Sequence, residues 1–209
     1  MGLPFSESQF LDVFGAFNQE LWPAVITLWG ITLAAVIQLW RMRRAGGGVM
    51  WLLALHWLWS GVAYHWRYFR AINPAAVIFA GLFVVQGAIF GWVWLMGNSR
   101  FAFDRSLRSL LGMGLCCYGL IYPFLGVGFG LRYPRLPLFA VPCPTTLVTA
   151  GLLLMSSGVP RVVSVVPILW SAIGSSAAIG LGIRADLALA VAGTLVAIDT
   201  LAPRALGPR

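Results

Sequence analysis

The chain has 209 residues, of which 60% are hydrophobic and only 10% charged, with a mean hydropathy of +0.87. A soluble domain carries roughly a quarter charged residues, so this composition excludes an ordinary soluble domain and indicates an integral membrane protein. The net charge of +8 comes from arginines scattered between apolar runs, which argues against nucleic acid as a partner. No lysine is present, which excludes any chemistry that needs a lysine Schiff base.

The N-terminal segment, residues 1–20, predicts an amphipathic helix that lies in the plane of the membrane interface. Ser6 and Gln9 have the spacing of a capping box at its start. Phe5 and Phe10 occupy the two hydrophobic staple positions around that cap. Apolar side chains then recur at helical spacing opposite polar ones, as expected for a helix with one face in lipid.

Two roles are open for this helix. It is either a plain interfacial anchor or a lid above an outward-facing cavity. As a lid it would be held against arginines on the outer side by its acidic side chains, Glu7, Asp12 and Glu20. In both cases we expect a turn into the first membrane span at Trp22-Pro23.

Seven apolar runs of roughly membrane-spanning length follow, and residues 21–209 are expected to form one domain. The runs are Leu21–Trp40, Gly48–Trp66, Ala75–Met96, Ser109–Gly130, Phe139–Ser157, Val162–Gly182 and Leu187–Leu201. The last is the weakest because it is short and contains Asp199. The predicted fold is therefore an all-α membrane protein, a bundle of about seven transmembrane helices with an amphipathic N-terminal interfacial helix.

The arginines predict the orientation, because positive residues collect on the cytoplasmic side. One side of the membrane would carry Arg41, Arg43, Arg44, Arg100, Arg105, Arg108, Arg161, Arg204 and Arg209. The other side would carry Arg67, Arg70, Arg132, Arg135 and Arg184. This bias predicts an outside N-terminus and a cytoplasmic C-terminus in an inner membrane. Without the seventh helix, Arg204 and Arg209 change sides and the bias disappears.

Several short motifs are spread over nearly the whole chain. They are Leu3-Pro4-Phe5, Gln9-Phe10-Leu11-Asp12-Val13-Phe14, Tyr64-His65-Trp66, Ile72-Asn73-Pro74-Ala75-Ala76, Arg132-Tyr133-Pro134 and Pro142-Cys143-Pro144-Thr145-Thr146. Together they resemble a family of small polytopic bacterial inner-membrane proteins known only as a domain of unknown function. The resemblance implies a bacterial membrane protein, but it supplies no activity, substrate or catalytic residue.

Polar side chains gather on the predicted outer side. They are Tyr64, His65, Arg67, Arg70, Asn73, Tyr122, Arg132, Tyr133, Arg135, Arg184 and Asp186. Guanidinium groups bind carboxylates and phosphates, so these residues predict a mouth that binds a small anion or another small solute. The alternative is that tyrosine and arginine serve here only as interface anchors.

The segment Pro142-Cys143-Pro144-Thr145-Thr146 adds Cys143, Thr145 and Thr146 to this predicted mouth. Prolines within a membrane helix leave carbonyls without donors, and threonine hydroxyls can partly compensate. Broken helices of this kind form ligand sites in transporters. The alternative is a kinked helix start with a buried thiol.

Three further polar residues lie inside apolar runs, where such side chains are costly: His56, Gln86 and Asp199. His56 and His65 are nine residues apart on one helix, so they should point to opposite faces and cannot hold one haem. We expect His65 to be interfacial. By depth, Asp199 has His56 or Arg44 as a partner; alternatively it faces water near Arg204.

Adjacent thiols can bind a soft metal, which makes Cys116 and Cys117 weak candidates for a metal site. Helical rise places them and Cys143 roughly 13 Å apart in depth, in a core about 30 Å thick, too far for one metal. Free cysteine also packs as an ordinary small apolar residue. No cofactor is therefore expected.

No catalytic constellation is visible, so an enzyme is not expected. The leading hypothesis is binding and translocation of a small solute or ion through the arginine- and tyrosine-lined mouth. The alternative is an accessory or scaffold subunit of a larger membrane complex, which would make other membrane subunits its partners alongside the lipid bilayer.

Overall fold

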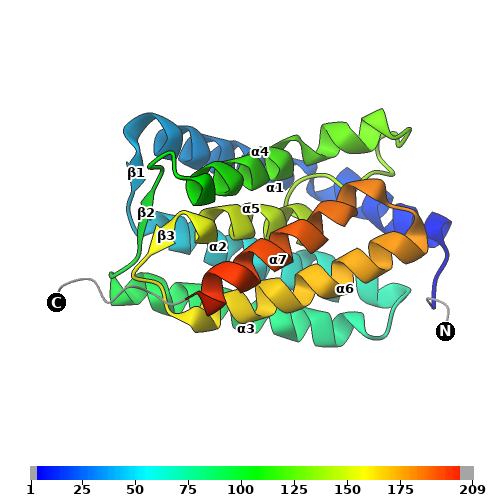
Figure 1. Cartoon of the computed structure of the whole chain (residues 1–209). Helices are drawn as coiled ribbons and strands as arrows, with labels where there is room; N and C mark the ends of the chain where they lie inside the picture. Colours follow the sequence, from blue (N-terminus) through cyan, green and yellow to red (C-terminus); the bar gives the residue numbers. More distant parts are fainter. Residues whose placement is uncertain (1–3, 203–209) are drawn as a thin grey trace.

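Seven α-helices lie side by side along one common direction in the computed structural model, which describes residues 4–202 (Figure 1). They are α1 (Glu7–Met42), α2 (Gly48–Trp59), α3 (Ala76–Met96), α4 (Leu107–Gly128), α5 (Pro142–Leu154), α6 (Val165–Leu181) and α7 (Ala188–Leu201). Four shorter helical segments are the π-helix η1 (Ser60–Trp66) and the 3₁₀ turns η2 (Phe69–Ala71), η3 (Arg161–Ser164) and η4 (Arg184–Leu187).

Each of the seven predicted apolar runs coincides with a helix. Four helices of the described chain are long and apolar enough to cross a membrane: α1, α3, α4, and η3 continuing into α6. The helix α2 continues into η1, so the predicted run Gly48–Trp66 is helical throughout. Helices α5 and α7 are shorter, with 13 and 14 residues. The chain is therefore an all-helical protein with several apolar helices of membrane-spanning length.

The first helix differs from expectation because it does not turn at Trp22-Pro23. α1 continues through Pro23 for 36 residues, so the predicted turn and the separate helix over residues 1–20 are wrong. Proline removes one backbone hydrogen bond, to the carbonyl four residues earlier, and that residue, Gln19, is exposed. The predicted start is confirmed: Ser6 and Gln9 form a capping box, and the Phe5 and Phe10 rings lie 5.7 Å apart.

The centre of the bundle is α5, in which every residue except Cys143 is buried. It packs against α4, α7, α6 and α2. Its closest neighbour is α4, where Gly112 faces Gly151: a Cβ on Gly112 would lie 2.6 Å from the Gly151 carbonyl oxygen. The two backbones approach this closely because neither residue has a side chain.

Three short strands join the interhelical connections at one end of the bundle, a feature that the sequence did not predict. β1 (Arg44–Ala45), β2 (Arg100–Ala102) and β3 (Ser156–Ser157) form an antiparallel sheet in the order β1-β2-β3. We call this the sheet end, and the opposite end, where α1 begins, the N-terminal end (Figure 1). Arg204 and Arg209 lie outside the described residues.

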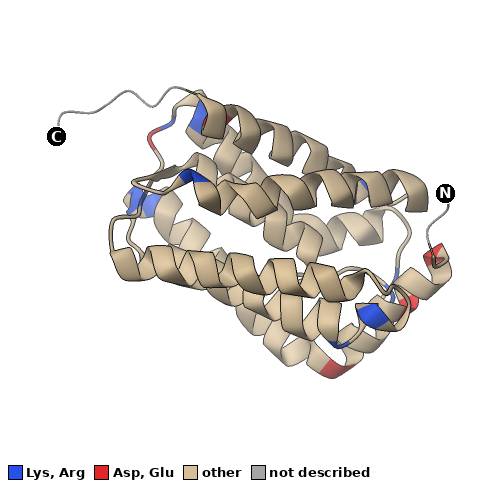
Figure 2. Cartoon of the chain, turned by 90° about the horizontal axis from the view of Figure 1, so that it is seen from below, with Lys and Arg blue, Asp and Glu red and all other residues tan. Residues whose placement is uncertain are grey.

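Charged residues gather toward these two ends and leave the middle of the bundle uncharged (Figure 2). The arginines of the described chain that were assigned to the cytoplasmic side belong to elements of the sheet end, and the other five belong to the N-terminal end. Large apolar side chains are exposed along the helices between them, among them Ile26, Ile78, Leu95, Phe124 and Ile179.

Candidate functional site

A cavity of about 140 Å³ lies at the N-terminal end, between α1, η1, α3, α4, α6 and the connections around them. Nine of its 22 lining residues have aromatic rings: Phe5, Phe10, Phe14, Tyr64, His65, Phe69, Phe79, Tyr122 and Trp170. Its other polar side chains include Asn73, Cys143 and Asp186. The predicted outer residues Tyr64, His65, Asn73 and Cys143 are thus brought together around one cavity.

The one carboxylate of this wall is Asp186, on η4, and its side chain is buried. The Tyr122 hydroxyl donates a hydrogen bond to it, and the Cys143 thiol is a second donor. Burial raises the pKa of the Asp186 carboxyl to about 6, although these two hydrogen bonds act in the opposite direction. Within residues 4–202 the carboxyl forms no ion pair.

Several polar atoms of the wall have no hydrogen-bond partner within the described part of the chain. His65 is fully buried, and neither Nδ1 nor Nε2 of its ring has a partner. The Tyr64 hydroxyl and the Trp170 indole Nε1 are also unpartnered. Buried polar atoms in proteins are nearly always hydrogen-bonded, so these three side chains call for a bound molecule that supplies partners.

The π-helix η1 positions Tyr64 and His65. At Ser60 the helix changes from α to π geometry, which alters the rotation per residue over the following turns. Gly61 permits close contact with α3, since a Cβ there would lie 3.1 Å from the Ala80 carbonyl oxygen. His65 then packs against Trp170, with ring centroids 5.0 Å apart. His65 is therefore buried against α3 and α6, and its place at the membrane interface stays a prediction.

The other histidine faces different elements, as the nine-residue spacing predicts. His56 Nε2 lies 2.7 Å from the Thr32 hydroxyl of α1, and its ring packs against Phe139. His65 instead contacts Phe83 of α3. Of the predicted intramembrane polar residues, Gln86 is also buried, where its amide donates to the Val163 carbonyl at 2.9 Å.

Irregular backbone enters the bundle just before α5. The buried stretch 136–141 is not helical, and its carbonyls receive hydrogen bonds from side chains of other helices. The Asn18 amide donates to the Pro134 and Leu136 carbonyls, each at 2.7 Å, and the Ser60 hydroxyl to the Ala140 carbonyl at 3.3 Å. Such backbone is tolerated at membrane depth only where protein satisfies it.

The helix α5 begins at Pro142 instead of being broken by its prolines. Proline is well suited to a first helical position, where its missing N–H has no intrahelical partner. The Thr146 hydroxyl donates to the Pro142 carbonyl at 2.8 Å, and Thr145 lies 3.3 Å from Ser60. Both threonines are buried behind the cavity wall, while Cys143 lines it. The geometry is that of the alternative prediction, a helix start that carries a thiol.

The predicted arginine mouth does not coincide with this cavity, because none of the five arginines lines it. Arg67 forms an ion pair with Glu20, and Arg135 lies 2.7 Å from Asp12. These contacts are two of those expected between α1 and the outer arginines. Each leaves less guanidinium free for an anion.

The other outer residues are exposed. The Arg70 guanidinium stacks over Trp66 at 4.2 Å from the ring centre. Arg132 and Tyr133 lie in the connection between α4 and α5, and Arg184 faces a separate groove that also contains Glu7. Sequence reasoning therefore placed six of the cavity-lining residues at one end of the molecule but missed much of the aromatic wall; the six are Tyr64, His65, Asn73, Tyr122, Cys143 and Asp186. Phe79 and Trp170 were missed because they resemble any other apolar side chain in a span.

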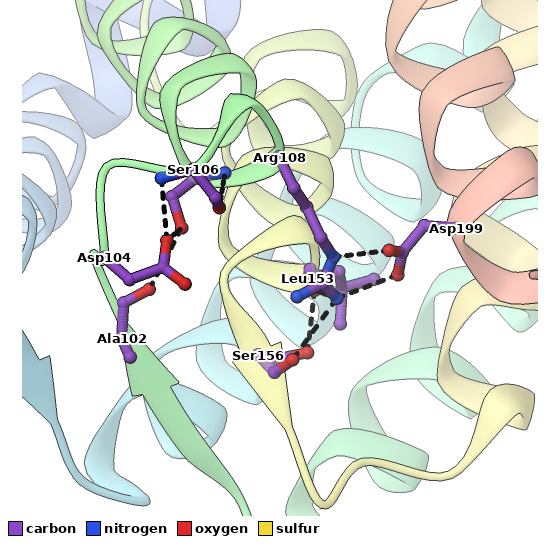
Figure 3. Close-up of polar contacts among 8 residues, drawn as sticks. Ala102, Asp104, Ser106, Arg108, Leu153, Ser156 and Asp199 are labelled. Atoms are coloured by element: carbon purple, nitrogen blue, oxygen red, sulfur yellow. Dashed lines mark hydrogen bonds and ion pairs between the residues drawn. The ribbon is translucent and has the colours of Figure 1, made fainter. Parts of the chain in front are cut away.

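Asp199 pairs with Arg108 at the sheet end, and not with His56 or Arg44 (Figure 3). The Arg108 guanidinium also donates to the carbonyls of Leu153 and Ser156, at 3.4 and 3.3 Å. Both members of the pair are partly exposed, 43% for Arg108 and 23% for Asp199. Asp199 therefore joins α7 to α4 and α5, far along the bundle from the cavity.

The three cysteines are free, and Cys143 lies on another helix than the adjacent Cys116 and Cys117. Cys116 is buried beside the Val148 carbonyl at 3.7 Å, whereas its neighbour Cys117 is exposed. Cys143 belongs to the cavity. Among the described residues no three histidine, cysteine or acidic side chains come together as metal ligands.

Comparison with known proteins identifies a family without a known activity. A family model described as a family of unknown function, DUF6064, matches residues 7–206. No curated protein and no solved structure matches the chain. The match covers nearly the whole bundle, from the first turn of α1 to beyond α7. The chain therefore belongs to the DUF6064 family.

Proposed function

We propose that this protein binds a small solute in the cavity at the N-terminal end and moves it across a bacterial inner membrane. The observation that carries the proposal is His65, a fully buried cavity side chain whose two ring nitrogens lack partners within the described residues. A bound solute would supply the missing hydrogen bonds.

In this proposal all seven helices cross the membrane, with the N-terminus outside and the C-terminus in the cytoplasm. The uncharged middle of the bundle and its exposed apolar side chains support the crossing (Figure 2). The arginine bias supports the orientation, since the sheet end carries more arginines than the N-terminal end. The short helix α5 is compatible with a span because irregular backbone, shielded by other helices, precedes it.

The dimensions of the cavity limit the solute. A cavity of about 140 Å³ is close to the roughly 150 Å³ engineered cavity that accommodates benzene. We therefore infer a solute of benzene-like size, with an apolar body and at least one polar group that reaches His65 or Tyr64.

A column of polar contacts supports movement of the solute beyond the cavity. Paired side chains continue from η1 and the start of α5 into the buried bundle. These are Ser60 with Thr145 at 3.3 Å, Trp57 with Thr149 at 2.9 Å and His56 with Thr32 at 2.7 Å. A solute leaving the cavity toward the sheet end would meet hydrogen-bonding groups along this column.

Binding is tested with the full chain in lipid nanodiscs, by following its melting temperature against a panel of small solutes. The matched variants are Ala177→Phe, which fills the cavity, and Ala172→Phe, on an exposed position of the same helix. We expect Ala177→Phe to abolish stabilisation by any solute that binds, and Ala172→Phe to retain it. The proposed site is contradicted if no solute raises the melting temperature of the protein, or if a solute stabilises Ala177→Phe and Ala172→Phe equally.

Movement is tested with the same solutes after reconstitution in liposomes. Uptake should exceed that of empty liposomes and should be lost in Ala177→Phe but not in Ala172→Phe. Binding without uptake would retain the site and contradict translocation.

A further inference from the structure

The Asp186 carboxyl has no positive side chain of the described chain paired with it. It is only 5% exposed, and its hydrogen-bond partners, Tyr122 and Cys143, are neutral donors. Arg184, two residues earlier, is exposed and lines a different groove. A buried carboxylate is costly unless a cation or several hydrogen bonds compensate it, so this position favours an incoming positive charge.

The aromatic side chains of the cavity wall also favour a positively charged ligand. Aromatic rings attract cations through the negative charge density of their faces, most strongly tryptophan, followed by tyrosine and phenylalanine. The cavity combines Trp170 and several phenylalanines with a single carboxylate. The Tyr64 ring stacks against Phe14 and Phe69, so Tyr64 contributes its hydroxyl and not a ring face. The unpartnered nitrogen of a neutral His65 ring and the Tyr64 oxygen can accept hydrogen bonds from the same ligand.

We propose that the solute is a small organic cation, whose ammonium group lies at Asp186 and whose apolar body contacts the aromatic wall. This assignment rests on the proposed binding function and names its ligand class. It differs from the anion that the outer arginines suggest, because Arg67 and Arg135 already pair with Glu20 and Asp12 outside the cavity.

A metal ion fits the cavity less well. Asp186 is accompanied by a thiol and a phenol, and although His65 lines the same cavity, no three histidine, cysteine or acidic side chains of the described chain come close enough together to hold a metal ion. An ammonium ion needs no such set of ligands, because aromatic faces and one carboxylate are sufficient to recognise it.

The test uses two probes of nearly equal shape, choline and its uncharged isostere 3,3-dimethylbutan-1-ol. Their affinities for the full chain in nanodiscs are measured by titration calorimetry at pH 7.5. We expect choline to bind at least tenfold more tightly than the neutral alcohol. This comparison needs no variant, so it does not depend on whether a substitution folds.

The variant Asp186→Asn keeps the shape of the side chain and removes its charge. It should lower the affinity for choline at least tenfold and leave that for the alcohol unchanged. Asp199→Asn removes a carboxylate outside the cavity and should change neither affinity.

The outcomes separate the ligand class from the binding function. Equal affinities for the two probes, or choline binding that survives Asp186→Asn, overturn the cation assignment while solute binding stands. The cation assignment is also overturned, and solute binding again stands, if neither probe binds but another solute binds to the protein and fails to bind to Ala177→Phe. If no solute binds at all, both proposals fail.

Discussion

The two ends of this bundle satisfy their polar groups in different ways. At the sheet end, backbone hydrogen bonds join three connections, and the Asp199–Arg108 pair links α7 to α4. At the N-terminal end, polar atoms of His65, Tyr64 and Trp170 are buried without partners in the described chain. The sheet end also leaves Arg43 Nη1 and Ser99 Oγ without partners among the described residues, but the N-terminal end gathers three such side chains around one cavity. Function is therefore expected at the end that is less well satisfied.

The largest effect is expected from a substitution that disrupts the packing of α4 against α5 at the centre of the bundle. In Gly112→Leu the new side chain would collide with the Gly151 backbone, and overpacking costs about 1–3 kcal/mol or more. We expect unfolding in detergent at a clearly lower denaturant concentration. Gly114→Leu, on the same helix with nothing within 4 Å of its Cβ, is the control and should be neutral. Equal stability of the two variants would contradict the α4–α5 contact.

The second prediction concerns pH at the N-terminal end. Because the pKa of Asp186 is raised to about 6, lowering the pH from 7 to 5 should weaken choline binding roughly tenfold. The stability of the unliganded protein should change in the opposite direction. A raised folded-state pKa means that this group's stability contribution is complete below its unfolded value of 3.8 and lost as pH rises through 6.

Other titratable groups face Asp186 and must be separated from it. They are Tyr118 and Tyr122 of α4, Cys143 of α5, and Tyr64 and His65 of η1; Arg184 of η4 is close in sequence but lines the other groove. Of these, only histidine ordinarily titrates near pH 6 to 7. His65→Gln should keep the pH dependence of choline binding and Asp186→Asn should remove it; the reverse result would assign the titration to His65.

A smaller effect is expected from the ion pair of the sheet end. Asp199 and Arg108 are both partly exposed, so their coupling should be about 1 kcal/mol or less. A double-mutant cycle with Asp199→Asn and Arg108→Gln measures it through the free energy of unfolding. Solute binding should be unchanged in all three variants. A loss of solute binding in Asp199→Asn would contradict the assignment of binding to the N-terminal end alone.

The smallest effect is expected at the rim of the N-terminal end. Arg67 and Glu20 are about half exposed, so Glu20→Gln should change the free energy of unfolding by about 0.5 kcal/mol or less. Added salt should reduce even that difference. A change above 1 kcal/mol would show that this contact holds α1 in place, which the aromatic contacts of Phe14 and Phe17 are expected to do.

Local signals predicted the fold where neighbouring residues decide it. The Ser6 capping box and the run Gly48–Trp66 depend on short-range hydrogen bonding and apolar length, and the structure shows both. The prediction at Pro23 was wrong because an exposed position in a helix tolerates the loss of the one backbone hydrogen bond that proline removes. The strands could not be predicted, because two or three residues carry no alternation and their partners lie in distant connections of the chain.

The site was predictable only in part for a similar reason. Tyr64, Asn73 and Cys143 were expected at the same end of the bundle because depth follows from helical rise, and the three line one cavity. The burial of His65 depends on η1, and no feature of the residue pattern distinguishes its π geometry from an α-helix. The partner of Asp199 depends on how α7 packs against α4, which depth alone does not determine.

The three-stranded sheet also affects how the bundle can move. Its strands connect α1 to α2, α3 to α4 and α5 to α6, so three pairs of helices are tied to one another at that end. Helices tied together in this way cannot separate there without breaking backbone hydrogen bonds. We therefore expect the sheet to act as a pivot, so that tilting of the helices produces its largest displacement around the cavity.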